Sequence, residues 1–234
     1  MYCSVFTIGL NMNRLSVYIP ILICVAGIGL PGGGNENNVE SDTLFERARR
    51  IHDKVLVLDT HVDIPINFAT DEVDPGLDGE LQVDLPKMRE GGMDAAFFIV
   101  YVRQTKRSQE NYLTALQLAM TKFNAIHRFT EVLYPGQIEL AYSASDVQRI
   151  AKSGKRVALI GIENGYVIGR DLKQLQVFYD LGARYMSLTH NGHNDLADSC
   201  CIKPDFGDTS SEHEGLSDLG RRIVDYLVHM GLLG

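Results

Sequence analysis

The chain has 234 residues, of which 45% are apolar and 22% are charged. This composition is ordinary for a folded globular protein and excludes wholesale disorder. The net charge of -8 provides no basic footprint, so we expect no nucleic-acid partner. The four cysteines show no spacing that predicts a disulfide framework.

Residues 1–34 are predicted to be a leader that directs export. They contain one charged residue, Arg14, followed by a mostly apolar run over residues 15–30. The run is shorter than the about 20 residues of a membrane-spanning helix. A positive residue, a short apolar run and then small residues are typical of an export signal. A cleaved signal, a lipoprotein anchored at Cys24 and an uncleaved anchor remain open, and we expect a periplasmic or membrane-attached protein.

Residues 35–50 are interpreted as a linker and an N-terminal helix that starts at Ser41. Residues 55–63 follow as an apolar run with polar residues at its end, which is typical of a buried parallel strand. Residues 95–101 form a second apolar strand. Apolar residues at spacings of three and four then predict a helix over residues 112–126.

The second half of the chain repeats this alternation. Residues 138–142 predict a short strand, and a capping box of Ser145 and Gln148 opens the next helix. Residues 157–162 are an apolar strand that runs into Glu163. Later elements follow the same pattern: a helix capped by Asp171 and Gln174 and ended by Gly182, a strand over 183–188, and a helix over 219–230.

Strands that alternate with helices predict an α/β protein with a parallel sheet. We count about five strands, and no second domain is evident in the sequence. A doubly wound open sheet and a closed (β/α)8 barrel of the TIM type both fit this alternation. The polar residues at the ends of the strands favour the barrel, whose active sites lie at the carboxyl ends of its strands.

Three apolar strands end in residues suited to metal binding or acid–base chemistry. The first ends in His61 and Asp63, a later one in Glu163, and the last in His190. His61 and Asp63 are two residues apart on a strand and therefore point the same way. An imidazole and carboxylates together suit Zn²⁺ or a similar ion. Each residue alone is a common structural feature, but their joint placement predicts a metal site.

The other histidines are interpreted as structural. His52, His127 and His229 fall in or beside helical stretches, and His213 is expected to be solvated in an acidic loop. His193 lies in an N-G-H-N turn that can be purely structural.

The sequence resembles the membrane dipeptidase family, also called renal dipeptidase, in the form of its bacterial branch. Four stretches and a G-L-S-x-L-G run carry the resemblance: residues 58–63, 82–98, 158–165, 181–199 and 215–220. The resemblance implies a (β/α)8 barrel with two zinc ions, where His61 and Asp63 bind one ion and Glu163 bridges both. It also implies that His190 contacts the substrate and that a metal-bridging hydroxide attacks the dipeptide bond.

The sequence departs from the family pattern. It lacks two further zinc-binding histidines, a substrate-binding arginine and an acid–base aspartate, all of which the family supplies from later strands. Residues 41–234 are also fewer than the about 250 of a typical barrel. We therefore expect residues 51–234 to be the N-terminal part of a truncated barrel, inactive and poorly soluble alone. Another binuclear hydrolase on the same barrel and an inactive fragment remain alternatives, and a homodimer remains open.

Overall fold

The structure is a computed structural model that describes residues 37–230. The predicted leader, residues 1–34 with Cys24, lies outside this part of the chain. Within the described part, no helix is both long and apolar enough to cross a membrane. The described residues divide at Val55 into a unit that holds the first helix and a unit that holds the sheet.

Helix α1 (Asn37–His52) forms the first unit. It begins four residues before Ser41, so the predicted helix start is wrong. No glycine or proline lies between Asn37 and Ser41, and the helix therefore continues through the polar segment that was interpreted as linker. Arg49 and Arg50 lie in its last turn, where positive charge is favourable to the helix dipole.

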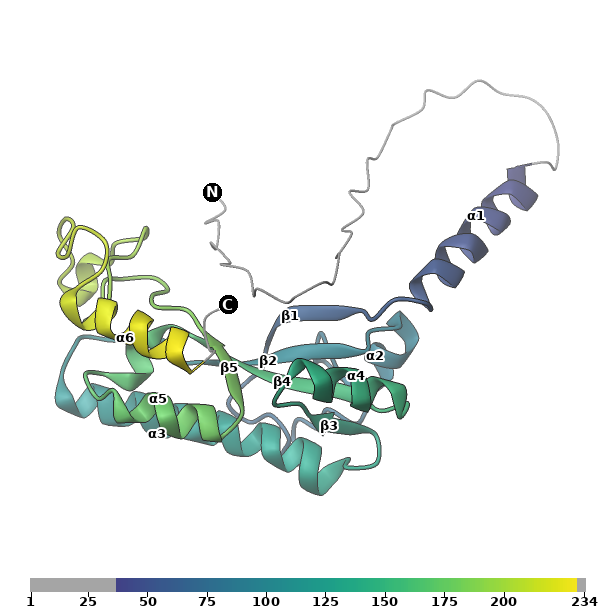
Figure 1. The fold of residues 1–234 in the computed structure, drawn as a ribbon, viewed down its shortest axis with the longest axis horizontal. Helices are drawn as coiled ribbons and strands as arrows, with labels where there is room; N and C mark the ends of the chain where they lie inside the picture. Colours follow the sequence, from purple (N-terminus) through teal and green to yellow (C-terminus); the bar gives the residue numbers. More distant parts are fainter. Residues whose placement is uncertain (1–36, 231–234) are drawn as a thin grey trace. The chain divides into compact units, whose positions relative to one another are not determined.

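Within residues 56–230, the second unit contains five strands, all parallel, which confirms the predicted α/β fold class with a parallel sheet of the TIM-barrel type (Figure 1). Strand β2 lies between β1 and β4, while β3 and β5 both pair with β4. The strands are β1 (Leu58–Asp63), β2 (Ala95–Tyr101), β3 (Ile138–Leu140), β4 (Arg156–Glu163) and β5 (Ala183–Met186).

Strands β3 and β5 share one edge of β4. Strand β2 pairs with β4 from Val157 to Glu163 and so occupies the other edge. Strand β3 pairs with the amino half of β4, from Arg156 to Ala158, and β5 pairs with the carboxyl half, from Ile160 to Ile162. The continuous order of the sheet is therefore β1-β2-β4-β5, with β3 as a short addition at the amino end.

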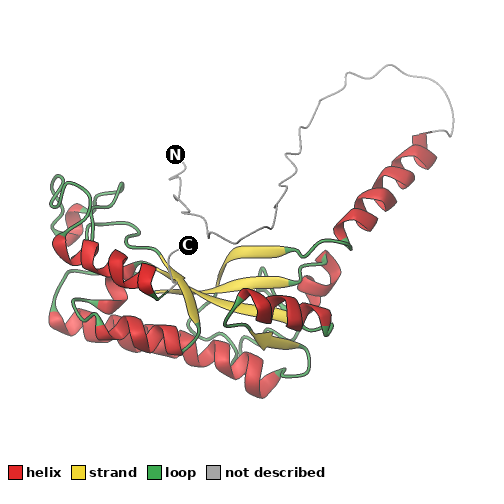
Figure 2. Ribbon diagram, viewed as in Figure 1, coloured by secondary structure: helices red, strands yellow, loops and turns green. Residues whose placement is uncertain are grey.

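Five further helices alternate with these strands, as Figure 2 shows. Helices α3 and α5 run side by side, with Phe123 and Phe178 stacked at 5.1 Å between ring centroids (Figure 1). A π-helical turn extends α3 through Leu133. The helices are α2 (Leu85–Gly91), α3 (Gln109–His127), α4 (Ala144–Lys152), α5 (Lys173–Asp180) and α6 (Asp218–His229).

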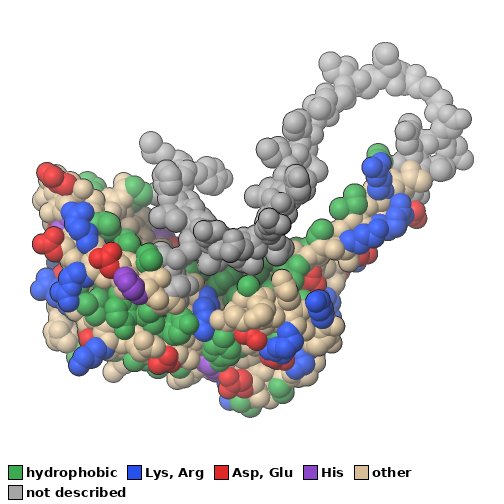
Figure 3. All heavy atoms as spheres, viewed as in Figure 1, with side chains coloured by type: hydrophobic (Ala, Val, Ile, Leu, Met, Phe, Trp, Pro, Cys, Tyr) green, Lys and Arg blue, Asp and Glu red, His purple; other side chains and the backbone are tan. Residues whose placement is uncertain are grey.

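Both faces of the central strands are buried, which explains their uninterrupted apolar sequences. Alternate residues of β2 point to opposite faces. Ala96 and Phe98 belong to the larger core with α2, α3, α5 and α6, whereas Ala95 and Phe97 pack in a second cluster with Ile150 of α4. On the visible face in Figure 3, basic and acidic side chains are interspersed among the apolar ones.

Strand β1 differs from its prediction in extent and in burial. It starts at Leu58 instead of residue 55, and only Val62 of its six residues is buried. Within the described residues β1 pairs with β2 alone, so it is an edge strand. Leu58 is 40% exposed as a result. Strand β5 is also shorter than predicted, because it ends at Met186 instead of residue 188.

Helix caps show where local sequence reasoning succeeded and failed. Helix α4 is capped by Ser143, whose hydroxyl accepts a hydrogen bond from the Asp146 amide, so the predicted cap at Ser145 is wrong. The N-cap of α5 is Leu172, so the predicted cap at Asp171 is wrong by one residue, although Asp171 accepts a hydrogen bond from the amide of Lys173. Gly182 follows α5 with φ of 102°, as predicted. Helix α2 was not predicted, although Asp84 caps it.

Candidate metal centre

The sheet brings the predicted site residues to one end. His61 and Asp63 lie on β1 and Glu163 is the last residue of β4. Strand β2 lies between β1 and β4 and links their registers. Ile99 of β2 pairs with Asp63 on one side and with Gly161 on the other, and Gly161 lies two residues before Glu163. Because the strands are parallel and in this register, side chains separated by 100 residues in the sequence meet at the same edge.

The side chains of His61, Asp63 and Glu163 converge. One ligand atom from each lies within 4.8 Å of the other two. His61 Nε2 is 3.5 Å from a Glu163 oxygen and 3.8 Å from an Asp63 oxygen. Zinc lies about 2.0–2.2 Å from imidazole and carboxylate ligands, so two ligands of one tetrahedral ion are roughly 3.4 Å apart. The donor types and their spacing therefore fit a zinc ion.

Glu163 lies between two histidines. Its Oε2 faces His61, and its Oε1 is 3.4 Å from Nε2 of His190. His190 belongs to the loop after β5, and its ring lies 5.0 Å from the ring of Tyr101 on β2. The Glu163 side chain is 17% exposed, so solvent still reaches it. A carboxylate whose two oxygens face different ligand groups has the arrangement needed to bridge two ions.

Three residues beside this cluster were not predicted from the sequence. Tyr185 of β5 and Tyr101 of β2 have raised pKa values because their phenols are buried and face the Glu163 carboxylate, so both remain protonated. Lys122 of α3 is buried and donates a hydrogen bond of 2.6 Å to the carbonyl of Ile64, just after β1. Burial lowers the pKa of Lys122, while the nearby carboxylates act in the opposite direction.

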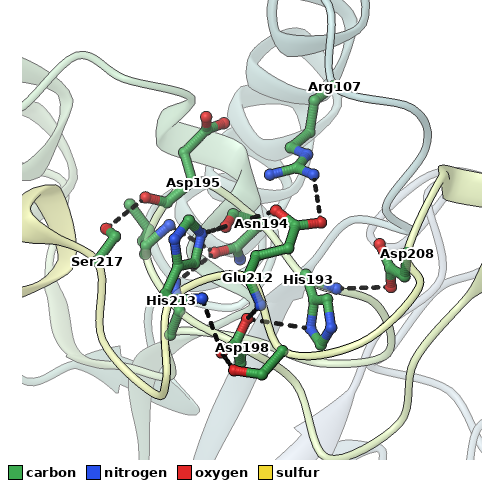
Figure 4. Close-up of polar contacts among 12 residues, drawn as sticks. Arg107, His193, Asn194, Asp195, Asp198, Asp208, Glu212, His213 and Ser217 are labelled. Atoms are coloured by element: carbon green, nitrogen blue, oxygen red, sulfur yellow. Dashed lines mark hydrogen bonds and ion pairs between the residues drawn. The ribbon is translucent and has the colours of Figure 1, made fainter.

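The loop after β5, residues 187–217, is held by a network of polar side chains (Figure 4). His193 is 2% exposed and uses both ring nitrogens. Its Nδ1 accepts a hydrogen bond of 2.9 Å from the amide of Ser199, and its Nε2 is 3.0 Å from the carbonyl of Ser210. Because the carbonyl only accepts, Nε2 carries the proton, and His193 is structural, as the sequence indicated.

Asp198 is the second centre of this loop. Its carboxylate accepts hydrogen bonds from the hydroxyl of Ser211 and from the amides of Glu212, His213 and Gly215. Burial acts to raise the pKa of Asp198, but these hydrogen bonds outweigh it and hold the pKa well below its usual range. The carboxylate is therefore ionised at neutral pH and ties the two sides of the loop together.

His213 also differs from its prediction. It was expected to be solvated, but its Nε2 lies 3.1 Å from the carbonyl of Asn194 and its side chain is 22% exposed (Figure 4). Its neighbour Glu212 pairs with Arg107 at 2.8 Å, which ties the loop to the segment before α3. The imidazole of His213 is therefore partly buried and bonded to the backbone of the loop, instead of solvated.

A parallel α/β sheet with imidazole and carboxylate groups gathered at its carboxyl edge is the arrangement expected of a metal-binding protein built on a barrel. The family model for membrane dipeptidase, peptidase family M19, matches residues 45–233. The chain therefore belongs to the membrane dipeptidase family, which confirms the resemblance to that family, while the assignment to its bacterial branch stays a prediction.

Individual relatives agree with this assignment. Dipeptidase tcpJ of Claviceps purpurea is 30% identical over 168 residues, which are 70% of this chain and 38% of the relative. Dipeptidase verJ of Clonostachys rogersoniana is 27% identical over 205 residues, covering 82% of this chain and 51% of the relative.

A solved structure shows the same fold. The crystal structure of the probable dipeptidase PvdM from Pseudomonas aeruginosa matches with a TM-score of 0.76 and 27% identity, covering 81% of this chain and 48% of that chain. A metallo peptidase from Rhodobacter sphaeroides, liganded with a phosphinate mimic of the dipeptide L-Ala-D-Ala, matches with a TM-score of 0.63 at 21% identity, covering 76% of this chain and 57% of that chain. This chain thus spans about 40–50% of the length of several proteins that it matches.

Proposed function

We propose that the protein containing this chain is a zinc-dependent dipeptidase. The observation that carries the proposal is the convergence of His61, Asp63 and Glu163 within 4.8 Å, at the carboxyl edge of the sheet in a chain of the M19 family. The family supports the reaction class, and the donor set supports the metal. Zinc fits best because its preferred ligands include imidazole and carboxylate groups together.

The residues of this chain have different roles in the proposed site. His61 and Asp63 would hold one ion, and Glu163 would bridge to a second, since its two oxygens face different sides of the cluster. When bound, the ions supply Lewis acidity that polarises the scissile carbonyl and lowers the pKa of a shared water. His190 would contact the substrate near this carbonyl, where an imidazole N–H can stabilise the charge that develops on the oxygen.

The test combines metal content with substrate profiling. The 234-residue chain and any longer protein that contains it are loaded with Zn²⁺, dialysed, and analysed for bound metal. Release of amino acids is then measured from a dipeptide panel that includes L-Ala-D-Ala, with a lactam and a phosphotriester as competing substrate classes. Hydrolysis restricted to dipeptides supports the proposal, and preference for either other class would show a different binuclear hydrolase.

Two variants connect this activity to the site. His61→Ala and Glu163→Ala are each expected to abolish dipeptide hydrolysis, because each removes a group that would hold the metal. Full activity in either variant would remove that residue from the proposed site.

The location and partners of the protein are proposed from the sequence alone. Export, with a periplasmic or membrane-attached product, follows from the leader pattern of residues 1–34. A cleaved signal and lipid attachment at Cys24 are the two alternatives within this proposal, and a homodimer remains open. Labelling with a radioactive fatty acid tests the lipid: incorporation that is lost in Cys24→Ser supports attachment there.

A further inference from the structure

The hydroxyl of Tyr185 connects two distant strands at the candidate metal centre. It donates a hydrogen bond of 2.9 Å to the carbonyl of Thr60 on β1, and it lies 3.4 Å from Nδ1 of His61. In the sheet order, β5 is separated from β1 by β4 and β2. Three strand spacings in a flat sheet are roughly 14 Å, beyond the reach of one side chain. The contact therefore depends on the curvature of the sheet.

These hydrogen bonds favour one tautomer of His61. A phenol has one proton, and the carbonyl of Thr60 can only accept it. The oxygen of Tyr185 is then left as an acceptor toward His61, and the tautomer that can donate to it carries its proton on Nδ1. In that tautomer Nε2 of His61, which faces Asp63 and Glu163, keeps its lone pair for a metal ion.

Gly161 provides the space that this arrangement needs. It is paired with Tyr185 in the register of β4 and β5. A Cβ atom at position 161 would lie 2.3 Å from Cζ of Tyr185, which is closer than non-bonded atoms approach. The ring of Phe97 packs on the Tyr185 ring at 5.0 Å between centroids. Glycine on one strand and phenylalanine on the next therefore hold the phenol against β1.

We propose that Tyr185 is a positioning residue that holds His61 in the Nδ1–H tautomer, with Nε2 directed into the metal centre. The inference rests on the proposed function only in taking Nε2 of His61 as a metal ligand. A histidine ligand is generally oriented by a hydrogen bond at its other ring nitrogen, usually to a carboxylate, a carbonyl or water. Here a neutral phenol takes that position.

The environment of Tyr185 suits a residue that orients the His61 ring. Its hydroxyl donates its proton to the carbonyl of Thr60, so toward His61 it acts as a neutral acceptor. A neutral partner orients the imidazole without adding a further negative charge to a site that already holds two carboxylates.

The experiment compares Tyr185→Phe with the unchanged 234-residue chain, and uses Tyr226→Phe on the exposed side of α6 as the matched loss of a hydroxyl. Long-range ¹H–¹⁵N NMR of the metal-free chain, at a pH about two units above the ordinary histidine pKa of about 6.5, reports which nitrogen of His61 is protonated. Competition with a chromophoric chelator then measures the affinity for Zn²⁺.

We expect Nδ1–H in the unchanged chain and in Tyr226→Phe, and a mixture with Nε2–H in Tyr185→Phe. We expect the zinc affinity of Tyr185→Phe to fall about 10- to 100-fold, the usual effect of removing the partner of a metal-binding histidine. An unchanged tautomer together with an unchanged affinity would overturn the inference. A third outcome separates the two proposals. If the unchanged chain shows Nδ1–H, Tyr185→Phe loses it, and neither protein binds zinc, the tautomer assignment stands and the proposed metal site fails.

A second pair of variants guards against a folding effect. Gly161→Ala keeps the hydroxyl but displaces the Tyr185 ring, whereas Gly136→Ala meets no atom within 4 Å. We expect Gly161→Ala to shift the tautomer in the same direction as Tyr185→Phe, and Gly136→Ala to leave it unchanged. A folded Gly161→Ala protein, judged by circular dichroism, with an unaltered His61 spectrum would contradict the geometry.

Discussion

Two clusters of histidines and carboxylates lie at the carboxyl side of the sheet, and they differ in how their polar atoms are used. In the loop after β5, both ring nitrogens of His193 have hydrogen-bond partners at 2.9 and 3.0 Å. At the ends of β1 and β4, Nε2 of His61 is 3.5 and 3.8 Å from two carboxylates, longer than ordinary hydrogen bonds. Within the described residues, the first cluster is internally satisfied and the second leaves ligand atoms facing a shared space.

This difference separates a structural cluster from the candidate metal centre. Buried polar groups are normally satisfied by hydrogen bonds, because an unsatisfied group costs free energy. The loop around His193 and Asp198 follows this rule and gains rigidity. The groups around Glu163 remain partly exposed and point at one another, which destabilises the empty arrangement but suits a cation. Composition alone does not distinguish the two clusters, since both contain histidine and acidic residues.

The largest expected effect is the loss of metal binding in Glu163→Ala. Its carboxylate faces both His61 and His190, so its removal takes away the central ligand. We expect the zinc affinity to fall more than about 100-fold, because even the loss of an outer partner costs about 10- to 100-fold. The chain should stay folded, since removing one of two facing carboxylates relieves repulsion. Isothermal titration measures the affinity, with exposed Glu110→Ala as control.

The matched change in the other cluster, His193→Ala, should have the opposite pattern. It removes a buried ring and leaves the Ser199 amide and Ser210 carbonyl without partners. We expect the free energy of unfolding in urea to fall by roughly 2–4 kcal/mol, with the zinc affinity within about threefold of the unchanged chain. A large loss of zinc affinity at full stability would show that the two clusters are not separate in function.

Acidification should weaken the loop cluster through Asp198. The pKa of its carboxyl is lowered in the folded state, so its contribution to stability is present above the unfolded-state pKa of about 3.9 and is lost as the pH falls further. We expect the unfolding free energy of the unchanged chain to fall between pH 5 and pH 3 more steeply than that of Asp198→Asn. Parallel pH profiles of the two proteins would contradict this assignment.

The smallest expected effect is a loss of stability at the cap of α4, which lies outside both clusters. Ser143→Ala removes the cap of α4 and should lower the free energy of unfolding by about 1 kcal/mol, whereas Ser145→Ala should change it by a few tenths. Thermal unfolding of the two variants measures the difference. Equal effects would mean that the hydroxyl of Ser143 contributes no specific capping interaction.

Local patterns predicted most elements but not their edges. The apolar run over residues 95–101 predicted β2 with the bounds that the structure shows, because both of its faces are buried. The first strand was predicted as buried because its sequence is apolar, yet burial depends on neighbours that the sequence does not show. The capping-box pattern of Ser145 and Gln148 predicted the wrong cap for α4, because the backbone geometry places Ser143 at the N-cap position.

The residues predicted for the candidate site are those that follow apolar strands, and residues inside helices and strands were missed. Parallel strands gather their carboxyl ends, so His61, Asp63, Glu163 and His190 could be placed together from their positions after apolar runs. Tyr185 and Lys122 could not be predicted in this way, because each lies within a strand or a helix and not after the end of a strand. Gly161 within an apolar strand was the available clue, since glycine there marks a close approach of another group.

The sequence by itself determined the alternation of strands and helices, the family and the candidate ligand residues, because these depend on periodicity and on residue type at strand ends. Only the tertiary structure decided which histidine is free to bind a ligand and which is tied into the fold. His61 lies near the end of β1, and His193 lies in the loop that follows β5. The partners of their ring nitrogens come from residues far apart in the chain, and only folding brings those partners into contact.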